Sequence, residues 1–183
     1  MSNKQALREL QQRLAQRMHA SRDQPDLASW LAVECAGQHF LLSLRQAAEI
    51  FAPQAIQHVP HSVSWLLGVA NLRGGLHTVV DLAAFLGLRP GARQVSGATA
   101  PALAPQARFV AFNPDLSINA ALQVDRLMGL RAAEQFTPWP ESAGTGARPR
   151  FAAQRLRDEQ GQPWQVIDLE ALARHEAFLN IVG

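Results

Sequence analysis

The chain contains no tyrosine, only one cysteine and no long apolar run, and each absence removes a class of protein. The single cysteine, Cys35, excludes an internal disulfide and a cysteine-rich zinc site. The longest uncharged stretches are interrupted by prolines and histidines, so none offers the roughly 20 apolar residues that a bilayer span needs. The N-terminus also lacks the apolar core of a secretory signal. We therefore expect a soluble, cytoplasmic protein.

Charge is scarce and unevenly placed. Charged residues make up 17% of the chain and hydrophobic residues 48%, which is typical of a folded protein with a sizeable core. Residues 1–22 hold five of the 17 basic side chains and one of the 15 acidic ones, which leaves 12 basic and 14 acidic residues in the body. Nucleic-acid-binding modules concentrate positive charge in their folded part and present aromatic platforms. A nucleic-acid-binding barrel is therefore only an alternative hypothesis.

Residues 1–26 differ in pattern from the rest. Leu7, Leu10, Leu14 and Met18 recur at spacings of three and four, which predicts an amphipathic helix that ends near residue 20, followed by a linker. This helix could bind a partner or a membrane surface. It could equally pack on the body or form a frayed extension, and the narrow apolar stripe favours that second interpretation.

From residue 28 onward, short apolar runs alternate with turn residues, which predicts strands. The pattern favours a mainly β fold with two small five-stranded barrels, at about residues 28–90 and 107–168, and a C-terminal helix over 169–178. Residues 90–106 are rich in Ala, Gly, Pro and Ser and predict a connector, and residues 138–149 a second loop. The predicted strands are 30–35, 39–44, 55–59, 65–72 and 77–82, then 108–112, 118–124, 127–130, 151–156 and 164–167.

The two halves resemble each other, which indicates an internal duplication. Residues 78–86 (Thr-Val-Val-Asp-Leu-Ala-Ala-Phe-Leu) and 165–173 (Gln-Val-Ile-Asp-Leu-Glu-Ala-Leu-Ala) each combine a strand, an aspartate and an apolar helix start. A fainter match relates residues 41–45 to residues 121–125. Since Asp81 and Asp168 fall where a strand passes into a helix, we expect them to cap short helices rather than to act as catalytic carboxylates.

The sequence carries little that predicts catalysis. The six histidines are scattered, and no cysteine or carboxylate completes a metal site beside His58 and His61. Nucleophile elbows, phosphate loops and dinucleotide fingerprints are missing. We expect no enzyme activity, no cofactor and no metal. The competing hypothesis is an enzyme that uses Cys35 or the carboxylates Asp158 and Glu159, although the favoured interpretations are a buried structural thiol and a solvated turn.

The most distinctive stretch is residues 65–82, where two apolar strands flank the turn Asn71-Leu-Arg-Gly74. Asn71 and Gly74 are residue types that tolerate a positive φ, and Arg73 lies between them. A guanidinium fixed in this way can hold carbonyls or a carboxylate of a partner. It can equally bridge strands of its own barrel, and spacing alone leaves both possibilities open.

These residues resemble the signature of the CheW-type coupling proteins, with Gly68-Val, the Asn71-Leu-Arg-Gly turn, an apolar strand and Asp81-Leu. Residues 37–44, 48–50, 59–60 and 124–126 agree with the family at matching places, and the resemblance spans about residues 28–175. It implies two SH3-like barrels and a non-enzymatic adaptor between chemoreceptor tips and a CheA-type histidine kinase. By analogy, the kinase would meet Glu49, Ile50 and Gly68, whereas the receptor would enter a groove near Asn71, Arg73 and Gly74.

Three departures from the flagellar pattern resemble the PilI-like branch, which serves type IV pili and twitching motility. They are the basic N-terminal segment, the long connector at 90–106 and Ala120-Ala121 before Val-Asp. Flagellar chemotaxis is the alternative output. In either case the resemblance implies a cytoplasmic protein that reaches the inner membrane only through its receptor, a methyl-accepting chemoreceptor.

Overall fold

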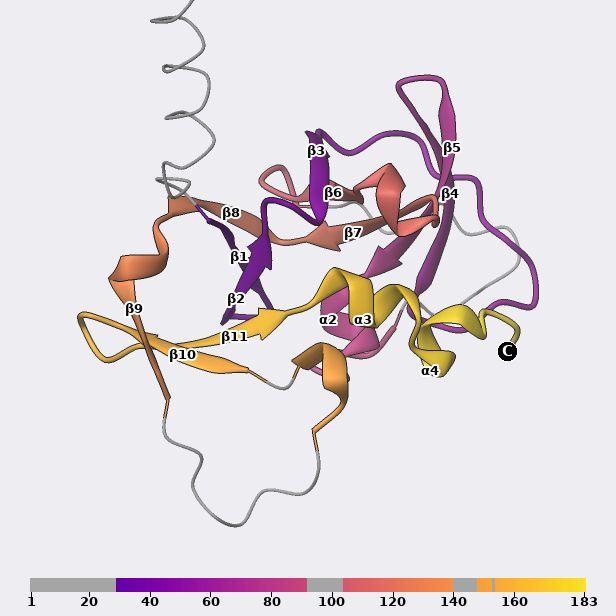
Figure 1. Cartoon of the computed structure of the whole chain (residues 1–183). Helices are drawn as coiled ribbons and strands as arrows, with labels where there is room; N and C mark the ends of the chain where they lie inside the picture. Colours follow the sequence, from indigo (N-terminus) through magenta and orange to yellow (C-terminus); the bar gives the residue numbers. More distant parts are fainter. Residues whose placement is uncertain (1–28, 92–103, 140–147, 153) are drawn as a thin grey trace, which may run out of the picture.

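The computed structural model describes residues 29–91, 104–139, 148–152 and 154–183 (Figure 1). The helix predicted before residue 20, most of the connector and the centre of the loop at 138–149 lie outside these residues. The described chain is mainly β, with two sheets and a few short helices. Within it, no helix is both long and apolar enough to cross a bilayer.

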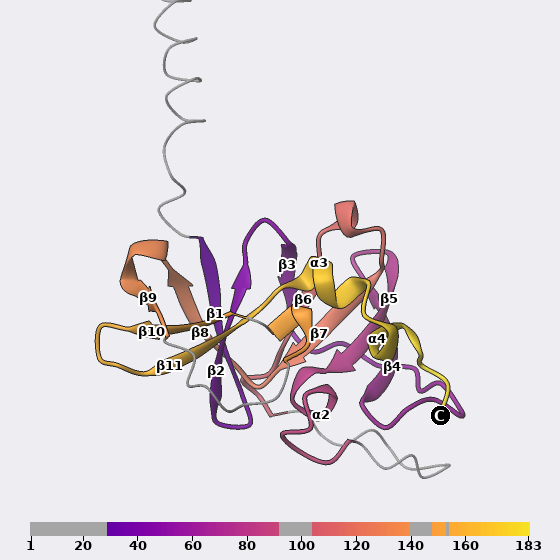
Figure 2. The ribbon, with the colours of Figure 1, turned by 60° about the horizontal axis from the view of Figure 1, so that its bottom comes forward.

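The first sheet, sheet A, has six strands in the order β8-β1-β2-β11-β10-β9. They are β1 (Trp30–Cys35), β2 (Gln38–Ser43), β8 (Arg126–Arg131), β9 (Phe136–Pro138), β10 (Arg155–Asp158) and β11 (Pro163–Ile167). Sheet B has five strands in the order β3-β6-β7-β5-β4. They are β3 (Ala47–Phe51), β4 (Leu66–Leu72), β5 (Gly75–Asp81), β6 (Arg108–Phe112) and β7 (Ala120–Val124). Figure 2 shows the two groups of strands side by side.

The sheets do not follow the expected division into residues 28–90 and residues 107–168. The hairpin β1–β2 lies in sheet A with strands from the second half of the chain, whereas the hairpin β6–β7 lies in sheet B with strands from the first half. The chain therefore crosses between the sheets after β2 and again after β7. The reason is physical: alternation predicts a strand, but the partner of a strand is set by packing between distant segments.

Each half of the chain contributes one hairpin to the sheet of the other half, and this reciprocal arrangement confirms the duplication. In sheet A, β11 runs parallel to β2, with Val166 opposite Leu41. In sheet B, β5 runs parallel to β7, with Val79 opposite Ala121. The residues that match in sequence thus occupy the same register in the two sheets.

In both sheets, the segment that follows one edge strand returns to pair at the opposite edge. After β8 the chain turns through a short 3₁₀ helix into β9, which pairs with β10. After β3 the chain reaches Gln57, which exchanges backbone hydrogen bonds of 2.7 and 2.8 Å with Val69 in β4. The strand predicted at 55–59 is therefore wrong, because only Gln57 pairs there. Pro53 and Pro60, which flank this segment, cannot donate to a ladder.

Other boundaries differ locally. Strand β3 was not predicted, because alternation is weak where its exposed positions carry Ala48 and Ile50. The strand predicted at 151–156 begins only at Arg155, after a 3₁₀ turn (Arg150–Ala152). The helix predicted at 169–178 is two helices, α3 (Leu169–Ala173) and α4 (Glu176–Leu179), separated at Arg174 and His175.

Three apolar clusters fill the fold. The largest lies between the sheets and contains residues of both, including Leu42, Cys35 and Leu122, together with Leu169 of α3. A second cluster belongs to sheet B alone, around Phe109. The third belongs to sheet A, around Leu41 and Trp164. Because the largest cluster is shared, burial of apolar surface holds the sheets together.

Candidate docking site

The turn between β4 and β5 presents the side chains of the signature. Leu72 pairs with Gly75, so only Arg73 and Gly74 form the loop, with φ of 50° and 85°. Two positive φ values in a two-residue loop are those of a type I′ turn, which matches the twist of the strands. The Asn71 side-chain oxygen accepts a hydrogen bond of 2.8 Å from the backbone N–H of Gly74 and fixes this conformation.

Arg73 is paired within its own chain. Its Nη1 donates to Oε1 of Glu49 in β3 at 2.9 Å. The side chains remain 76% and 43% exposed, respectively, so water screens the pair and it contributes little to stability. Of the two possibilities left open by the sequence, the structure shows the bridge between strands. The exposed guanidinium nevertheless stays within reach of a partner.

Gly68 has a different role from a surface contact. It is buried in β4, and its φ is 139°. A Cβ atom built there would lie 2.2 Å from the carbonyl oxygen of Gln57, so only glycine allows the segment after β3 to approach β4. Gly68 therefore affects the surface near Arg73 and Glu49 only indirectly, because it is itself buried.

Two large apolar side chains of sheet B are exposed. Ile50 in β3 is 43% exposed, and Leu76, opposite Asn71 in the β4–β5 hairpin, is 64% exposed. Ile50 is therefore a surface residue and not a core residue. The ion pair of Glu49 and Arg73 joins the edge strand that carries Ile50 to the hairpin that carries Leu76.

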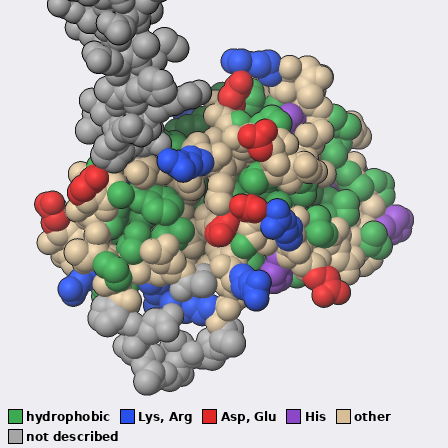
Figure 3. Space-filling view, in the orientation of Figure 1, with side chains coloured by type: hydrophobic (Ala, Val, Ile, Leu, Met, Phe, Trp, Pro, Cys, Tyr) green, Lys and Arg blue, Asp and Glu red, His purple; other side chains and the backbone are tan. Residues whose placement is uncertain are grey.

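Charges of both signs are mixed on the surface. On the face shown in Figure 3, basic and acidic side chains alternate among apolar and neutral ones. No continuous basic area appears on that face. This view gives no support to the phosphate-tracking surface that the nucleic-acid hypothesis requires.

The residues considered for catalysis occupy structural positions. Cys35 is fully buried, and burial raises the pKa of its thiol to about 12. Asp158 ends β10, directly before the turn to β11, and accepts hydrogen bonds from Gln160 N, Gln162 N and Trp164 Nε1. Burial opposes ionisation of Asp158, but these donors outweigh it and lower its pKa. The described residues contain no group of three His, Cys, Asp or Glu side chains placed to hold a metal ion.

The sequence did not single out Arg89 or Gln46, although both bind the helix-capping aspartates. Arg89 donates to Asp81 and Asp125, and Gln46 donates to Asp168. These contacts join residues up to 122 positions apart. Only Asp81 and Arg89, eight positions apart, are near each other in sequence, and their spacing is neither that of a strand nor that of a helix turn, so no periodic pattern indicated these contacts.

This geometry defines the class of the protein: a pair of interlocked SH3-like barrels with an exposed hairpin turn. Residues 29–177 match the family model of the CheW-like domain, and the chain belongs to that family.

Two relatives and one solved structure extend the comparison. Protein PilI of Pseudomonas aeruginosa is 27% identical over 173 residues, which cover 92% of this chain and 88% of PilI. A probable chemotaxis protein CheW of Rhizobium etli is 37% identical over 60 residues, 33% of this chain and 39% of that protein. The crystal structure of the scaffolding protein TtCheW from Thermoanaerobacter tengcongensis superposes with a TM-score of 0.61 at 18% identity, over 80% of this chain and 88% of that one. This last likeness concerns the fold.

Proposed function

We propose that this chain is a non-enzymatic adaptor that couples the cytoplasmic tips of chemoreceptors to a CheA-type histidine kinase in a bacterial chemosensory array. We further propose that the array controls type IV pili and twitching motility. The observation that carries the proposal is the match to PilI over 92% of this chain and 88% of PilI. The flagellar alternative rests on the match to a CheW protein, which covers 33% of the chain.

The face on sheet B is where we propose that the partners bind. The kinase regulatory domain would contact Ile50 and Glu49, because an exposed apolar side chain on an edge strand favours docking of another barrel. The receptor tip would contact Asn71, Arg73 and Gly74, since a fixed guanidinium can bind carbonyls or a carboxylate. Gly68 would act indirectly, by holding the segment after β3 against β4.

Other features fit an adaptor better than an enzyme. The thiol of Cys35 is buried with a raised pKa, and the carboxylate of Asp158 accepts three hydrogen bonds within its turn. The adaptor would work in the cytoplasm and reach the inner membrane through its receptor. No nucleic acid takes part in this function. A gel shift at low salt that showed sub-micromolar binding by residues 24–183 would favour the nucleic-acid alternative instead.

Deletion and complementation in the source bacterium test the output. We expect deletion of the gene to abolish twitching and to leave swimming intact, and the wild-type gene on a plasmid to restore twitching. Loss of swimming alone would favour the flagellar alternative. Affinity purification of the tagged chain from the same cells, with mass spectrometry, should recover a CheA-type kinase and a chemoreceptor. Recovery of neither would contradict the adaptor role.

A further inference from the structure

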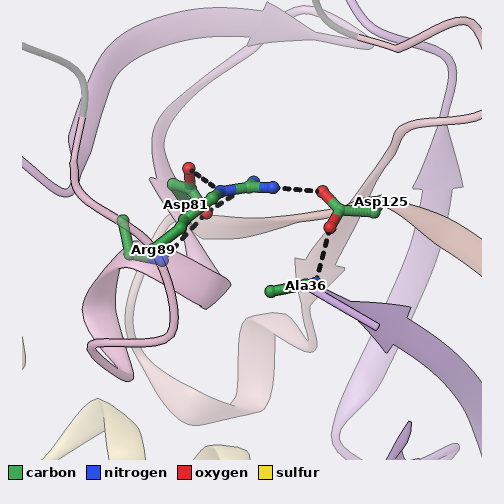
Figure 4. A network of polar contacts seen from close by, with 5 residues as sticks. Ala36, Asp81, Arg89 and Asp125 are labelled. Atoms are coloured by element: carbon green, nitrogen blue, oxygen red, sulfur yellow. Dashed lines mark hydrogen bonds and ion pairs between the residues drawn. The ribbon is translucent and has the colours of Figure 1, made fainter. Parts of the chain in front are cut away.

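One arginine binds carboxylates from two parts of the fold (Figure 4). Arg89 Nε and Nη2 donate to the two carboxylate oxygens of Asp81 at 2.9 and 2.8 Å. Its Nη1 donates to Oδ1 of Asp125 at 2.7 Å. The planar guanidinium can form this fork on one side and still bind a second carboxylate on the other. We call Asp81, Arg89 and Asp125 the Arg89 clamp.

The clamp connects the two sheets. Asp81 ends β5 of sheet B, whereas Asp125 lies between β7 and β8, where the chain passes from sheet B into sheet A. The second carboxylate oxygen of Asp125 accepts a hydrogen bond of 2.7 Å from the backbone N–H of Ala36, and its own N–H donates to the carbonyl of Glu34 at 3.0 Å. Both belong to the β1–β2 hairpin of sheet A. Arg89 therefore holds sheet B to the hairpin of sheet A.

The clamp is ionic and partly shielded from water. The side chains of Asp81, Asp125 and Arg89 are 9%, 26% and 31% exposed. Burial alone would lower the pKa of Arg89, but the hydrogen bonds from Arg89 to the two aspartates outweigh this effect and raise it. Arg89 is thus charged throughout the working pH range, and the partial exposure leaves the clamp sensitive to salt.

At the other crossover between the sheets, the neutral amide of Gln46 takes the place that the guanidinium of Arg89 has in the clamp. Gln46, between β2 and β3, donates from Nε2 to Oδ1 of Asp168 at 2.9 Å and accepts from the N–H of Leu169 at 2.9 Å. An amide makes these bonds, so salt screens them far less than an ion pair. Of these two sets of contacts, only the Arg89 clamp pairs opposite charges, so it is the more sensitive to salt.

We propose that Arg89 is a positioning residue that locks sheet A and sheet B into one rigid body, so that partners docked on the chain meet a fixed geometry. Without the clamp, the shared core and the Gln46 contacts would still hold the sheets together, but the sheets would part more often. The proposal rests on the adaptor function for its consequence in assembly. The mechanical part, that Arg89 restrains the separation of the sheets, stands independently of any partner.

The chain contains its own reporter of that separation. Cys35 is the only cysteine, and it is buried in the cluster that both sheets share. It directly precedes Ala36, whose N–H binds Asp125. A thiol reagent can reach Cys35 only when the shared core opens, by parting of the sheets or by lifting of the end of the β1–β2 hairpin, or when the protein unfolds. The labelling rate in native buffer therefore measures how often this core opens.

The first test compares three variants of the full chain with a colorimetric disulfide reagent. Asp125→Asn and Arg89→Gln cut the clamp, whereas Arg126→Gln removes the same charge from an exposed pair with Glu34 that lies wholly within sheet A. We expect Asp125→Asn and Arg89→Gln to label about tenfold faster than wild type. Arg126→Gln should label within about twofold of wild type. Added NaCl should speed labelling of wild type but have little effect on Asp125→Asn.

Two results would overturn the mechanical part: clamp variants that label at the wild-type rate, or Arg126→Gln labelling as fast as they do. Global unfolding is recognised by its urea dependence, which scales with the surface exposed. Separation of the sheets gives a shallower dependence than the cooperative unfolding transition seen by circular dichroism. If labelling of Asp125→Asn had the full unfolding dependence, the clamp would contribute only to overall stability.

The second test measures assembly with the purified kinase and receptor fragments of the source bacterium. We expect Asp125→Asn to bind the kinase regulatory domain within about twofold of wild type, but to form the three-component complex about tenfold less readily. Wild-type assembly by Asp125→Asn would overturn the positioning role. Failure of the wild-type chain itself to bind either fragment would instead contradict the proposed function and leave the labelling result to judge the clamp.

Discussion

Asp81 and Asp168 occupy equivalent positions in the two sheets. Asp81 ends β5 and Asp168 directly follows β11, the two strands that pair in parallel with a hairpin from the other half of the chain, and each aspartate caps a short helix. Asp81 accepts from Ala84 N at 3.1 Å, and Asp168 accepts from Glu170 N and Ala171 N at 3.0 and 3.1 Å. Each also binds a side chain that reaches a crossover between the sheets. In each half, one carboxylate therefore both caps a helix and accepts hydrogen bonds from a side chain that links the sheets.

The cap at Asp168 gives the first prediction. Asp168→Ala should lower the free energy of unfolding by about 1–3 kcal/mol, because two helix amides and the amide of Gln46 lose their acceptor. Urea denaturation measures the change. Glu170→Ala is the control, since its pair with Arg174 is exposed and should be worth less than about 0.5 kcal/mol. Equal effects of the two variants would contradict the capping role.

Substitution of Gly68 can be compared with substitution of Gly74. Both have a positive φ, but a Cβ atom at Gly68 meets the Gln57 carbonyl, whereas nothing lies within 4 Å of one at Gly74. We expect Gly74→Ala to cost about 1–2 kcal/mol of unfolding free energy from backbone strain alone. Gly68→Ala should cost more and disturb the bridge between Gln57 and Val69, which amide exchange detects. A smaller loss for Gly68→Ala would refute the close approach.

Arg73→Glu should change the unfolding free energy by less than about 1 kcal/mol, because the pair with Glu49 is exposed. It should weaken receptor binding by charge repulsion and loss of the guanidinium contacts. The double variant Arg73→Glu with Glu49→Arg restores the internal pair with its charges reversed. If receptor binding recovers in the double variant, Arg73 acts by holding β3 to the hairpin. Continued weakness supports direct contact, and native affinity of Arg73→Glu contradicts both roles.

Ile50→Asp should reduce kinase binding by more than about 1.4 kcal/mol, or tenfold, because it places a charge on an apolar contact. Since Ile50 is 43% exposed, the thermal unfolding midpoint should hardly change. Leu179→Asp, at a residue in α4 that is 53% exposed, controls for the loss of a surface apolar side chain. Unchanged calorimetric titration of Ile50→Asp would remove Ile50 from the docking surface.

Cys35 gives a prediction in pH. Burial raises its pKa from 9.0 to about 12, so the folded protein keeps the proton while the unfolded chain releases it. The contribution of Cys35 to stability is therefore complete below pH 9.0 and is lost as the pH rises towards about 12. Urea denaturation of Cys35→Ala should show a weaker fall in stability over this range. Rapid alkylation of native Cys35 at neutral pH would contradict its burial and revive the enzyme hypothesis.

Much of the local structure could be read from the sequence. Strands β1 and β6 match their predicted bounds, and Asp81 and Asp168 cap helices as expected. A turn with a positive φ at Gly74 also followed from residue type, but the other positive φ lies at Arg73 and not at Asn71, where residue type had favoured it. These features depend on neighbours within a few positions: side chains alternate along a strand, an aspartate binds the next free amides, and glycine tolerates positive φ.

The tertiary structure alone decided which strands pair, and with them the surroundings of the site. The duplicated halves predicted two contiguous barrels, yet each hairpin pairs with strands of the other half because the shared core is buried that way. The same packing gives Gly68 its neighbour Gln57, Arg73 its partner Glu49, and Arg89 its two aspartates. The sequence by itself determined the elements and the family signature. Contacts between distant segments depend on the summed burial of the whole chain, and only the folded structure reveals them.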